Sequence, residues 1–435
     1  MTDRYVVKNI GRKAEDKLIK VTVPGSKSIT NRALLLSVLA EGETNLSGVL
    51  FSDDSRHFME CVKSLGYDAT INESDKTIKI VSDGTQIPKK EASIYVGSAG
   101  TAARFLTALL GISKGEYYLD ASAQMKKRPM APLLKTLQDM GTKVECKEQE
   151  GHFPFELKSE GVTNNHINVN IDTSSQFLSA LLISAPCIED SLTIDVEGKH
   201  GMAYIDMTIK MMKQFGVEVT NQDNKTFVIE NNQVYKGMDY QIEPDVSAAC
   251  YFYAMAAITG SSVIVNNVYF DSLQGDIQFI NFLEEMGCQV VETPGGIQVT
   301  GPKKGCLKGI TADMHSCSDQ AITMAAIAPY ADGDVKITGI GHIKYQESNR
   351  IQAIVNELTK MEIECEQGDD YIIIHPGTPA PACVSTYDDH RIAMGFSLTG
   401  LVADGIVIDD PGCCRKTFEN YFEVLDDVIE HQILG

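Results

Sequence analysis

Long apolar runs and clustered cysteines are missing from this sequence of 435 residues. No apolar run approaches the roughly 18 residues that a transmembrane helix needs. The polar start, residues 1–5, predicts that the chain has no signal peptide. The eleven cysteines are scattered without CxxC or zinc-type spacing, so neither a disulfide framework nor a metal site is expected. These absences favour a cytoplasmic protein of a reducing compartment, with no membrane partner.

Positive charge is also scarce. The sequence has 38 Lys and Arg residues against 59 Asp and Glu residues, which gives a formal net charge of −21. A nucleic-acid partner is not expected, because such binding needs a broad basic face. A small anionic ligand remains compatible with this charge, since the local field in a cleft can oppose the net charge.

Arginine is the scarcer of the two cations, with nine arginines against 29 lysines. Because the composition favours lysine for general surface use, the positions that keep an arginine are informative. Its planar, permanently charged guanidinium suits carboxylate or phosphate groups. No matching acidic motif accompanies these arginines, so they predict a ligand with more than one negative group. Those expected in the first turn or two of a helix are Arg32, Arg104, Arg128, Arg350 and Arg391.

A cluster of small or polar residues followed by an apolar run recurs every 71 to 75 residues. A second, amphipathic helix follows in each repeat and usually stops at a glycine, as at Leu65-Gly66, whereas the fifth stops at Met361-Glu362. Each repeat therefore reads strand–helix–strand–helix–strands. The six predicted helix starts are Lys27, Gly100, Ser175, Val246, Asp319 and His390.

The first helix of each repeat is apolar nearly all round, which predicts that it is buried. A buried helix ringed by sheets forms a prism, and three repeats close one domain. The sequence thus predicts an α/β fold of two domains, each an inside-out α/β prism of three βαβαββ units with buried helices. The expected domains are 24–243 and 1–23 plus 244–435, with the helix N-termini and the active site at the cleft between them.

The first helix start follows a predicted strand that ends at a Pro24-Gly25 break. Ser26 or Ser28 is placed to cap the helix. The free N–H groups of its first turn, together with the helix dipole, favour an anion. Lys27 and Arg32 add full positive charge to that site.

This stretch closely resembles the 3-phosphoshikimate 1-carboxyvinyltransferases, or EPSP synthases, of the enolpyruvyl transferase superfamily. The resemblance continues in order over nearly the whole chain. The other matching stretches are Gly97-Ser98-Ala99-Gly100-Thr101-Ala102-Ala103-Arg104, Arg128-Pro129-Met130, Ser174-Ser175-Gln176-Phe177-Leu178, Ala203-Tyr204-Ile205-Asp206, Asp313-Met314 to Asp319, Glu347 to Arg350, Tyr387-Asp388-Asp389-His390-Arg391 and Lys416-Thr417-Phe418.

The resemblance implies an enzyme that joins phosphoenolpyruvate to the 5-hydroxyl of shikimate 3-phosphate and releases phosphate. This chemistry needs a base for the hydroxyl, an acid for the methylene carbon and dense positive charge around the substrates. It needs no metal and no organic cofactor. We expect a monomer that closes on its substrates, with glyphosate, a known inhibitor of the family, competing for the phosphoenolpyruvate pocket.

The resemblance also implies three sets of functional residues. Asp319 is the implied base at the 5-hydroxyl, and Glu347 is the implied proton donor at the methylene. The full catalytic set is Asp319, Glu347, Lys27, His390 and Lys416. The implied shikimate 3-phosphate ligands are Lys27, Ser28, Arg32, Ser174, Ser175, Gln176, Tyr204, Asp319, His342 and Gln346. The implied phosphoenolpyruvate ligands are Lys27, Gly100, Arg128, Gln176, Glu347, Arg350, Arg391 and Lys416.

The chain departs from the family pattern at residues 346–350, where Lys-Glu-Ser/Thr-Asp-Arg is usual. Gln346 replaces a lysine, so weaker stabilisation of the developing anion is expected unless Lys344 reaches the site. Asn349 replaces an aspartate that orients the arginine, so Arg350 is expected to be less firmly held. Further departures are Ser98, Gly201 and His342.

Three other functions compete with this interpretation. A UDP-N-acetylglucosamine enolpyruvyl transferase typically has a reactive cysteine in the loop that corresponds to residues 124–128, where this chain has none. A non-catalytic anion-binding homologue would keep the fold but lose turnover through Gln346 and Asn349. A nucleic-acid end-processing enzyme fits poorly with the net charge of −21.

Overall fold

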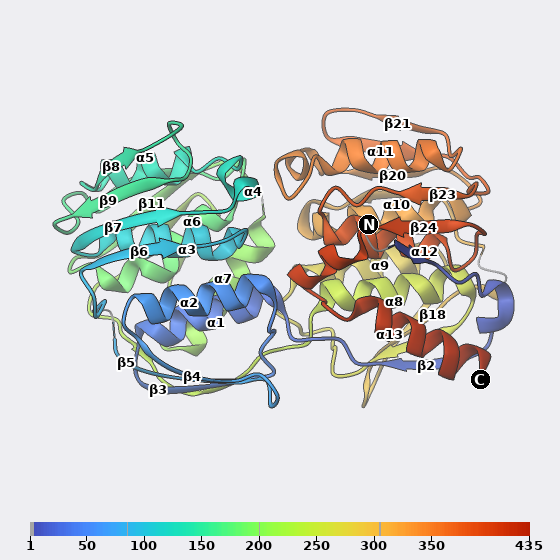
Figure 1. Cartoon of the computed structure of the whole chain (residues 1–435), viewed down its shortest axis with the longest axis horizontal. Helices are drawn as coiled ribbons and strands as arrows, with labels where there is room; N and C mark the ends of the chain where they lie inside the picture. The colour runs from blue at the N-terminus through green and yellow to red at the C-terminus, as the bar shows by residue number, and fades with distance from the viewer. Residues whose placement is uncertain (1–3, 85, 200, 304–305) are drawn as a thin grey trace. The chain divides into compact units, whose positions relative to one another are not determined.

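The computed structural model describes residues 4–84, 86–199, 201–303 and 306–435. The chain divides into two compact units. Unit 1 is Met1–Pro24 with Glu243–Gly435, and unit 2 is Gly25–Ile242. In the described part of the chain, each unit has three sheets (Figure 1). The predicted α/β fold of two domains with buried helices is confirmed.

Among its described residues, unit 2 contains three inner helices, three outer helices and one short additional helix. The inner helices are α1 (Lys27–Leu39), α3 (Gly100–Ile112) and α6 (Gln176–Ser184). The outer helices are α2 (Asp53–Ser64), α5 (Ala131–Asp139) and α7 (Met202–Gln214), with the short α4 (Ala123–Lys126) before α5. The strands are β3 (Ala40–Ser47), β4 (Asp68–Asn72), β5 (Thr77–Asp83), β6 (Glu91–Tyr95), β7 (Gly115–Asp120), β8 (Lys143–Cys146), β9 (Phe155–Ser159), β10 (His166–Asn170), β11 (Leu192–Glu197), β12 (Thr220–Gln222), β13 (Thr226–Ile229), β14 (Tyr235–Lys236) and β15 (Asp239–Gln241).

Unit 1 repeats this plan. Its inner helices are α8 (Val246–Thr259), α10 (Ala321–Ile327) and α12 (His390–Thr399), and its outer helices are α9 (Phe279–Glu285), α11 (Arg350–Lys360) and α13 (Tyr421–Asp427). Four short 3₁₀ turns of this unit carry residues of the candidate site or its neighbours: η3 (Gly275–Gln278), η5 (His315–Gln320), η7 (Gly341–Tyr345) and η8 (Pro411–Lys416). The strands are β1 (Arg4–Val6), β2 (Leu18–Val21), β16 (Ser262–Val265), β17 (Gln289–Thr293), β18 (Gly296–Thr300), β19 (Thr311–Asp313), β20 (Val335–Thr338), β21 (Cys365–Gln367), β22 (Tyr371–Ile374), β23 (Ala382–Val384) and β24 (Ile406–Asp409).

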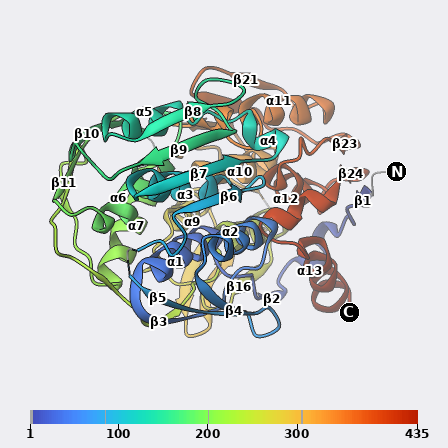
Figure 2. The ribbon, with the colours of Figure 1, turned by 60° about the vertical axis from the view of Figure 1, so that its left-hand side comes forward.

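Each sheet has the same internal pattern. A strand pairs in parallel with the strand that follows the inner helix, and a hairpin adds antiparallel strands beside it. The sheet β6-β7-β9-β8 follows this order and can be traced in Figure 2. In the last sheet, β1 from the start of the chain pairs antiparallel with β24 and takes the place of the hairpin.

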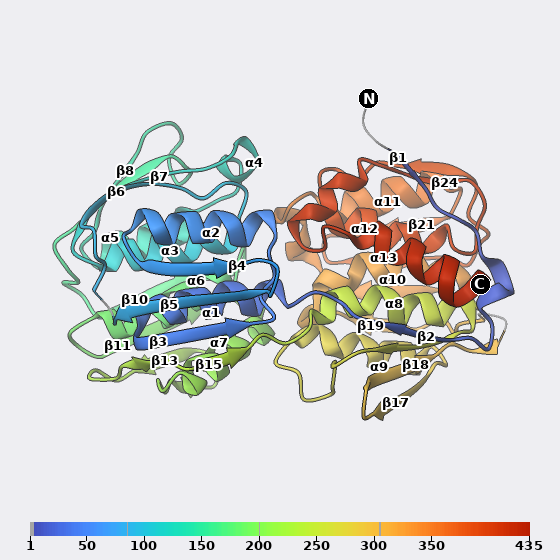
Figure 3. The ribbon, with the colours of Figure 1, turned by 60° about the horizontal axis from the view of Figure 1, so that its bottom comes forward.

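The strands at the two crossings between units are exchanged. Strand β2 directly precedes α1 in the sequence, yet it pairs in parallel with β16 of unit 1. Strand β15 precedes α8, yet it pairs in parallel with β3 of unit 2, in the sheet that also contains β5 and β4 (Figure 3). Each unit therefore completes one sheet with a strand from a distant part of the chain.

The inner helices are buried along nearly their whole length. Helices α3 and α10 are buried at every residue. In the other four, every residue that is not buried lies at the first or second position of its helix. Only the N-terminal ends of the inner helices therefore offer side chains to a ligand. These partly exposed residues are Lys27, Ser28, Gln176, Ser247 and Arg391.

Five outer helices end in a residue with left-handed backbone geometry. Four of these positions are glycines with φ between 91° and 104°, a region that an L side chain rarely adopts. The fifth is Glu362, with φ of 59°. The backbone at the end of α11 is therefore left-handed as well, although the residue there, Glu362, has a Cβ. The four glycines are Gly66, Gly141, Gly216 and Gly287.

We predict that Glu362→Gly raises the stability of the protein by about 0.5–1 kcal/mol, because it relieves a left-handed conformation at the end of α11. Gly287→Ala is the matched variant at the end of α9. A Cβ there meets nothing within 4 Å, so any effect comes from the backbone alone. This variant is expected to lower stability by about 1 kcal/mol. Thermal unfolding midpoints of both variants measure the effect, and equal midpoints would contradict it.

Candidate active site

The N-terminal turns of the three inner helices of unit 2 meet around Arg32. Its guanidinium carbon lies 5.5 Å from the centre of the Phe105 ring of α3. Its Nη2 donates to Ser179 Oγ of α6 at 3.4 Å. The guanidinium carbon of Arg104 in α3 lies 5.7 Å from the Phe177 ring of α6. The starts of α1, α3 and α6 therefore lie together at one end of this unit.

Arg32 is a buried cation whose hydrogen bonds go only to neutral oxygens among the described residues. Nε donates to Thr208 Oγ1 at 2.7 Å, and Nη1 donates to the Ser28 carbonyl at 3.0 Å. Nη2 donates to Ser179 and to the Tyr204 carbonyl. Burial lowers the pKa of Arg32 to about 10, so it stays charged at pH 7. Four of its five N–H groups are used, which leaves one for a ligand.

Lys27 is the first residue of α1, where Ser26 caps the helix by accepting from the Ile29 N–H. The Lys27 ammonium lies 2.5 Å from Asp54 Oδ2 of α2. The Asp54 side chain is only 5% exposed, whereas that of Lys27 is 19% exposed. This ion pair therefore fixes the lysine from behind and leaves its outer side accessible to an anion.

Gly100 begins α3 and lies against two guanidinium groups. A Cβ at this position would lie 2.6 Å from Arg128 Nη1 and 2.7 Å from Arg104 Nη1. Any side chain would displace one of these cations, which is the physical reason for a glycine here. Arg104 also donates to the Gly100 carbonyl at 3.0 Å. Arg128 lies between α4 and α5 rather than inside a helix, so the prediction that it belongs to a helix start is wrong.

Ser174, Ser175 and Gln176 form the start of α6. Ser174 Oγ accepts from the Gln176 N–H at 3.3 Å, and the side-chain oxygen of Gln176 is buried without a hydrogen-bond partner among the described residues. Tyr204 of α7 lies nearby, with its ring centre 5.9 Å from the Arg32 guanidinium. Gly201 has φ of 68°, and a Cβ there would lie 2.4 Å from Ser175 Oγ. Any side chain at 201 would therefore require Ser175 to move.

In unit 1, Asp319 joins two arginines. Its two carboxylate oxygens each lie 2.8 Å from a guanidinium nitrogen, one of Arg350 and one of Arg391. Arg391 is the second residue of α12, and its Nη2 also donates to Ser247 Oγ of α8 at 3.5 Å. Asp319 lies in η5, before α10 begins at Ala321, so the prediction that it starts an α-helix is wrong.

Arg350 is only 1% exposed and is surrounded by carboxylates. It contacts Asp389 and Asp319 at 2.8 Å, and Glu347 also at 2.8 Å. Burial lowers the pKa of Arg350, but the three carboxylates outweigh burial and raise it well above its ordinary value. The prediction that the arginines lack matching acidic residues is therefore wrong for Arg350 and for Arg391, although it holds for Arg32.

All five N–H groups of Arg350 are used. Besides the three carboxylates, Nη1 donates to the side-chain oxygen of Gln346. Asn349 caps α11 by accepting from the Gln352 N–H at 3.3 Å. The expectation that Asn349 leaves Arg350 loosely held is wrong, because Asp389 holds the guanidinium through two bonds instead. Lys344 pairs with Asp369 at 3.0 Å.

His342 of η7 accepts or donates a hydrogen bond with Ser318 Oγ at 2.7 Å. Burial lowers the pKa of His342 to about 4, with smaller contributions from His315 and Arg350 and opposition from Asp319. The ring is therefore neutral at pH 7, and it lies beside Asp319 without adding charge.

Lys416 and His390 lie beside a strained loop. Tyr387 and Asp388 both have positive φ, at 57° and 52°, which is costly for residues with a Cβ and is concentrated at functional sites. Lys416 donates to the Asp388 carbonyl at 2.5 Å and lies 3.0 Å from its carboxylate. His390, the first residue of α12, is 2% exposed.

The predicted site residues thus form two groups, each within one unit. The group in unit 2 contains Lys27, Ser28, Arg32, Gly100, Arg128, Ser174, Ser175, Gln176 and Tyr204. The group in unit 1 contains Asp319, His342, Gln346, Glu347, Arg350, His390, Arg391 and Lys416. Among residues 4–84, 86–199, 201–303 and 306–435, no cluster of three or more His, Cys, Asp or Glu could hold a metal ion. In those same ranges, no helix is long and apolar enough to cross a bilayer.

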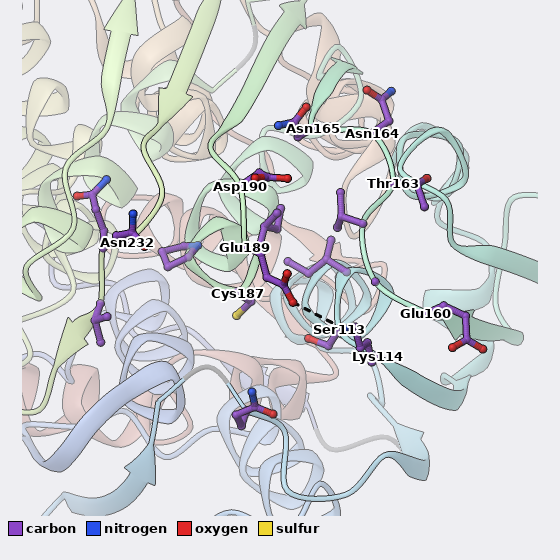
Figure 4. Close-up of a pocket in the computed structure, with 18 of the residues that line it drawn as sticks. Ser113, Lys114, Glu160, Thr163, Asn164, Asn165, Cys187, Glu189, Asp190 and Asn232 are labelled. Atoms are coloured by element: carbon purple, nitrogen blue, oxygen red, sulfur yellow. Dashed lines mark ion pairs between the residues drawn. The ribbon is translucent and has the colours of Figure 1, made fainter.

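A separate cavity of about 490 Å³ lies at the other end of the inner helices of unit 2 (Figure 4). It follows the C-terminal end of α3, at Ile112 and Ser113, and the turn after α6, at Cys187. An ion pair of 3.7 Å joins Lys114 and Glu189 at its edge. Helix C-termini carry partial negative charge, so this cavity is less suited to a phosphate than the N-terminal end.

Sequence reasoning missed several residues that complete the two groups. Asp54 pairs with Lys27 and Asp389 pairs with Arg350, two of the predicted cations. Asp276, in η3, accepts a hydrogen bond from Gln320, the residue that follows Asp319. These carboxylates lie far along the chain from their partners, so no local spacing could reveal them.

A family model, curated relatives and solved structures all match this chain to 3-phosphoshikimate 1-carboxyvinyltransferases, also called EPSP synthases. The family model described as EPSP synthase (3-phosphoshikimate 1-carboxyvinyltransferase) matches residues 15–425. A 3-phosphoshikimate 1-carboxyvinyltransferase of Trichormus variabilis is 45% identical over 403 residues, which cover 92% of this chain and 94% of that protein. A 3-phosphoshikimate 1-carboxyvinyltransferase 2 of Halalkalibacterium halodurans is 39% identical, with coverage of 94% and 91%. A solved EPSP synthase of Acinetobacter baumannii has a TM-score of 0.80 at 25% identity, covering 98% of each chain.

We predict that His342 makes the protein less stable in mild acid. The unfolded chain binds a proton at this residue near pH 6.5, whereas the folded chain resists protonation down to about pH 4. Stability is therefore lost as pH falls through this window, by about 2–3 kcal/mol at pH 4. In His342→Asn this part of the decline should disappear from urea unfolding measured between pH 7 and 4. His431→Asn, at an exposed histidine, should keep the wild-type decline; an unchanged slope in His342→Asn would refute the assignment.

Proposed function

The chain belongs to the EPSP synthase family, the 3-phosphoshikimate 1-carboxyvinyltransferases, and on this premise we propose how its residues perform the reaction. The enzyme transfers the enolpyruvyl group of phosphoenolpyruvate to the 5-hydroxyl of shikimate 3-phosphate and releases phosphate, a step of the shikimate pathway of aromatic amino-acid biosynthesis. The match over residues 15–425 is the observation that carries this conclusion.

The reaction first forms a tetrahedral intermediate. The methylene carbon of phosphoenolpyruvate gains a proton, and the 5-hydroxyl loses one as its oxygen adds to the neighbouring carbon. Loss of phosphate and of a methyl proton then restores the double bond. Both substrates carry a phosphate and a carboxylate, so the enzyme must offset strong negative charge while it moves protons at two positions.

We propose that the group in unit 2 binds shikimate 3-phosphate. Ser174, Ser175 and Gln176 offer hydroxyl, amide and backbone donors at a helix N-terminus, which suits a phosphate. Lys27 adds charge from the start of α1, held by Asp54. Arg32 contributes its positive charge and one N–H group, because its other four N–H groups already donate to protein oxygens. The remaining proposed ligands are Ser28, Tyr204, Asp319, His342 and Gln346.

We propose that guanidinium and ammonium groups hold phosphoenolpyruvate. Gly100 leaves room for Arg128 beside the start of α3. In unit 1, Arg350 has no spare N–H group, so a substrate carboxylate must displace one of its present partners. Glu347 and Gln346 are the partners to displace, since Asp389 is fully buried behind the guanidinium. The other proposed ligands are Lys27, Gln176, Arg391 and Lys416.

This exchange suits the proposed acid–base roles. Displacement from Arg350 would free the Glu347 carboxylate to take up a proton from water, and the resulting carboxyl group would donate that proton to the methylene carbon. Asp319 would accept the proton of the 5-hydroxyl while both arginines keep its carboxylate oriented. His390 and Lys416 would lie beside phosphoenolpyruvate, where His390 can pass protons.

The alternative functions are not favoured. The named relatives are 3-phosphoshikimate 1-carboxyvinyltransferases, not UDP-N-acetylglucosamine transferases. A non-catalytic homologue is not favoured either, because Asp319, Glu347, His390 and Lys416 are all present. We further propose a cytoplasmic monomer. Eleven free cysteines support a reducing compartment, and each group of site residues is built by one chain.

Asp319→Ala and Glu347→Gln are each expected to lower kcat at least about a hundredfold, the usual range for general acid–base groups. Purified protein with phosphoenolpyruvate and shikimate 3-phosphate, followed by phosphate release, measures the effect. Asn349→Ala serves as the control, because it removes only the cap of α11 and should keep kcat within about twofold of wild type. Near-normal rates in Asp319→Ala or Glu347→Gln would remove the corresponding role.

Gln346→Lys is expected to raise kcat/KM for phosphoenolpyruvate. A lysine cannot accept the hydrogen bond that Gln346 now accepts, so one Arg350 donor becomes available, and its ammonium adds positive charge. Lys344 does not supply that charge here, since it pairs with Asp369. Gln346→Leu is the matched variant, which frees the donor without adding charge. An unchanged or lower kcat/KM in Gln346→Lys would show that neither effect limits the wild-type enzyme.

A further inference from the structure

Asp276 is a buried carboxyl group that the proposed mechanism does not use. It lies in η3 and is 4% exposed. Within the described residues it forms no ion pair, although burying a carboxylate without a cation is costly. Such a costly group is retained when it does something that an apolar residue could not.

The contacts of Asp276 lead to Arg391 and to the end of η5 that carries Asp319. Its Oδ2 accepts from the Ser247 hydroxyl and from Gln320 Nε2 at 3.2 Å. Ser247 Oγ in turn accepts from Arg391 Nη2 at 3.5 Å. Gln320 directly follows Asp319, and its side-chain oxygen accepts from Thr323 Oγ1 at 3.0 Å, which fixes the orientation of the amide.

One carboxylate oxygen thus sets the direction of two neighbouring groups. Because the Ser247 hydroxyl donates to Asp276, its oxygen lone pairs remain for Arg391. Because the Gln320 amide is held at both ends, the end of η5 that carries Asp319 is held as well. Arg391 and Asp319 then meet at 2.8 Å.

We propose that Asp276 is a positioning residue for the transferase reaction, which acts through Ser247 and Gln320 to orient Arg391 and Asp319. The inference rests on the proposed role of Arg391 in holding phosphoenolpyruvate. Loss of the Asp276 carboxylate would leave the Ser247 hydroxyl free to turn toward other acceptors, so Arg391 would be less well oriented before the substrate binds.

The environment of Asp276 disfavours its charged form, so the ionised carboxylate lowers the stability of the fold. Burial and the negative charge of Asp319 raise the pKa of Asp276 to about 6, against Arg391 and the hydrogen bonds from Ser247 and Gln320. The thiols of Cys250 in α8 and Cys317 in η5 also face it. Above pH 6 the folded chain must hold a charge that the unfolded chain holds more easily. The Asp276 charge therefore destabilises the fold at pH 8, and this penalty fades as pH falls below 6.

The test uses Asp276→Asn in the full chain, with Ser247→Ala and Cys250→Ala beside it. Asp276→Asn should raise KM for phosphoenolpyruvate at least about fivefold, lower kcat less, and leave KM for shikimate 3-phosphate within about twofold. Its thermal midpoint should exceed that of wild type at pH 8, and the difference should shrink at pH 5. A more stable but less effective enzyme is the signature of a functional, not structural, carboxylate.

The two companion variants separate the causes. Ser247→Ala breaks the link to Arg391 but keeps the Asp276 charge, so it should raise KM for phosphoenolpyruvate without the gain in stability. Cys250→Ala removes a thiol that donates to the Asp276 carbonyl at 3.7 Å but not to its carboxylate, and it should leave both KM values within about twofold. The phosphate groups of the substrates titrate near pH 6 as well, but equally for every variant.

Three results would overturn the inference: an unchanged KM for phosphoenolpyruvate in Asp276→Asn, a lower thermal midpoint at pH 8, or failure of this variant to fold. The last two would make Asp276 a structural residue. Failure of the proposed function is seen separately, because wild-type protein would then give no phosphate from the two substrates. If instead Asp319→Ala kept its rate while Asp276→Asn changed KM, only the role of Asp319 would fall.

Discussion

The structure depends on the burial of apolar helices inside sheets. Each unit encloses three helices whose residues are buried except at their first two positions. Because the side chains along the helices are committed to the core, chemistry can be placed only at the helix ends. The N-terminal ends carry unpaired N–H groups and partial positive charge, so this architecture favours ligands with phosphate and carboxylate groups.

The two units use this principle in different ways. In unit 2 the central cation, Arg32, bonds only to neutral oxygens and keeps its full charge for a ligand. In unit 1 the central cation, Arg350, is saturated by carboxylates. The first arrangement attracts an anion at once, whereas the second requires the anion to replace a carboxylate of the protein. This difference fits the proposal that Glu347, once displaced from Arg350, takes part in protonating phosphoenolpyruvate.

The fold could be predicted from the sequence because it follows from local patterns, whereas most of the site residues were expected from the resemblance to EPSP synthases. The apolar runs after each polar cluster gave the inner helices, and their starts gave Lys27, Gly100, Gln176 and Arg391. Pairings between distant segments could not be predicted in this way. The contact of Arg350 with Asp389, and that of Asp276 with Gln320, depend on tertiary packing that leaves no periodic signal. The sequence around Asn349 could not show that Asp389, at the start of α12, holds Arg350 in its place.

The central claim, that the inner helix starts bind the substrates, is tested most directly by hydrogen exchange with each substrate alone, when no turnover occurs. The first amides of a helix lack intrahelical partners and exchange quickly unless a ligand accepts their hydrogen bonds. The account predicts that shikimate 3-phosphate slows exchange at residues 27–30 and 174–178, with no change at residues 112–114 and 186–190 around the cavity of Figure 4. Slowed exchange at that cavity, with none at the helix starts, would contradict it.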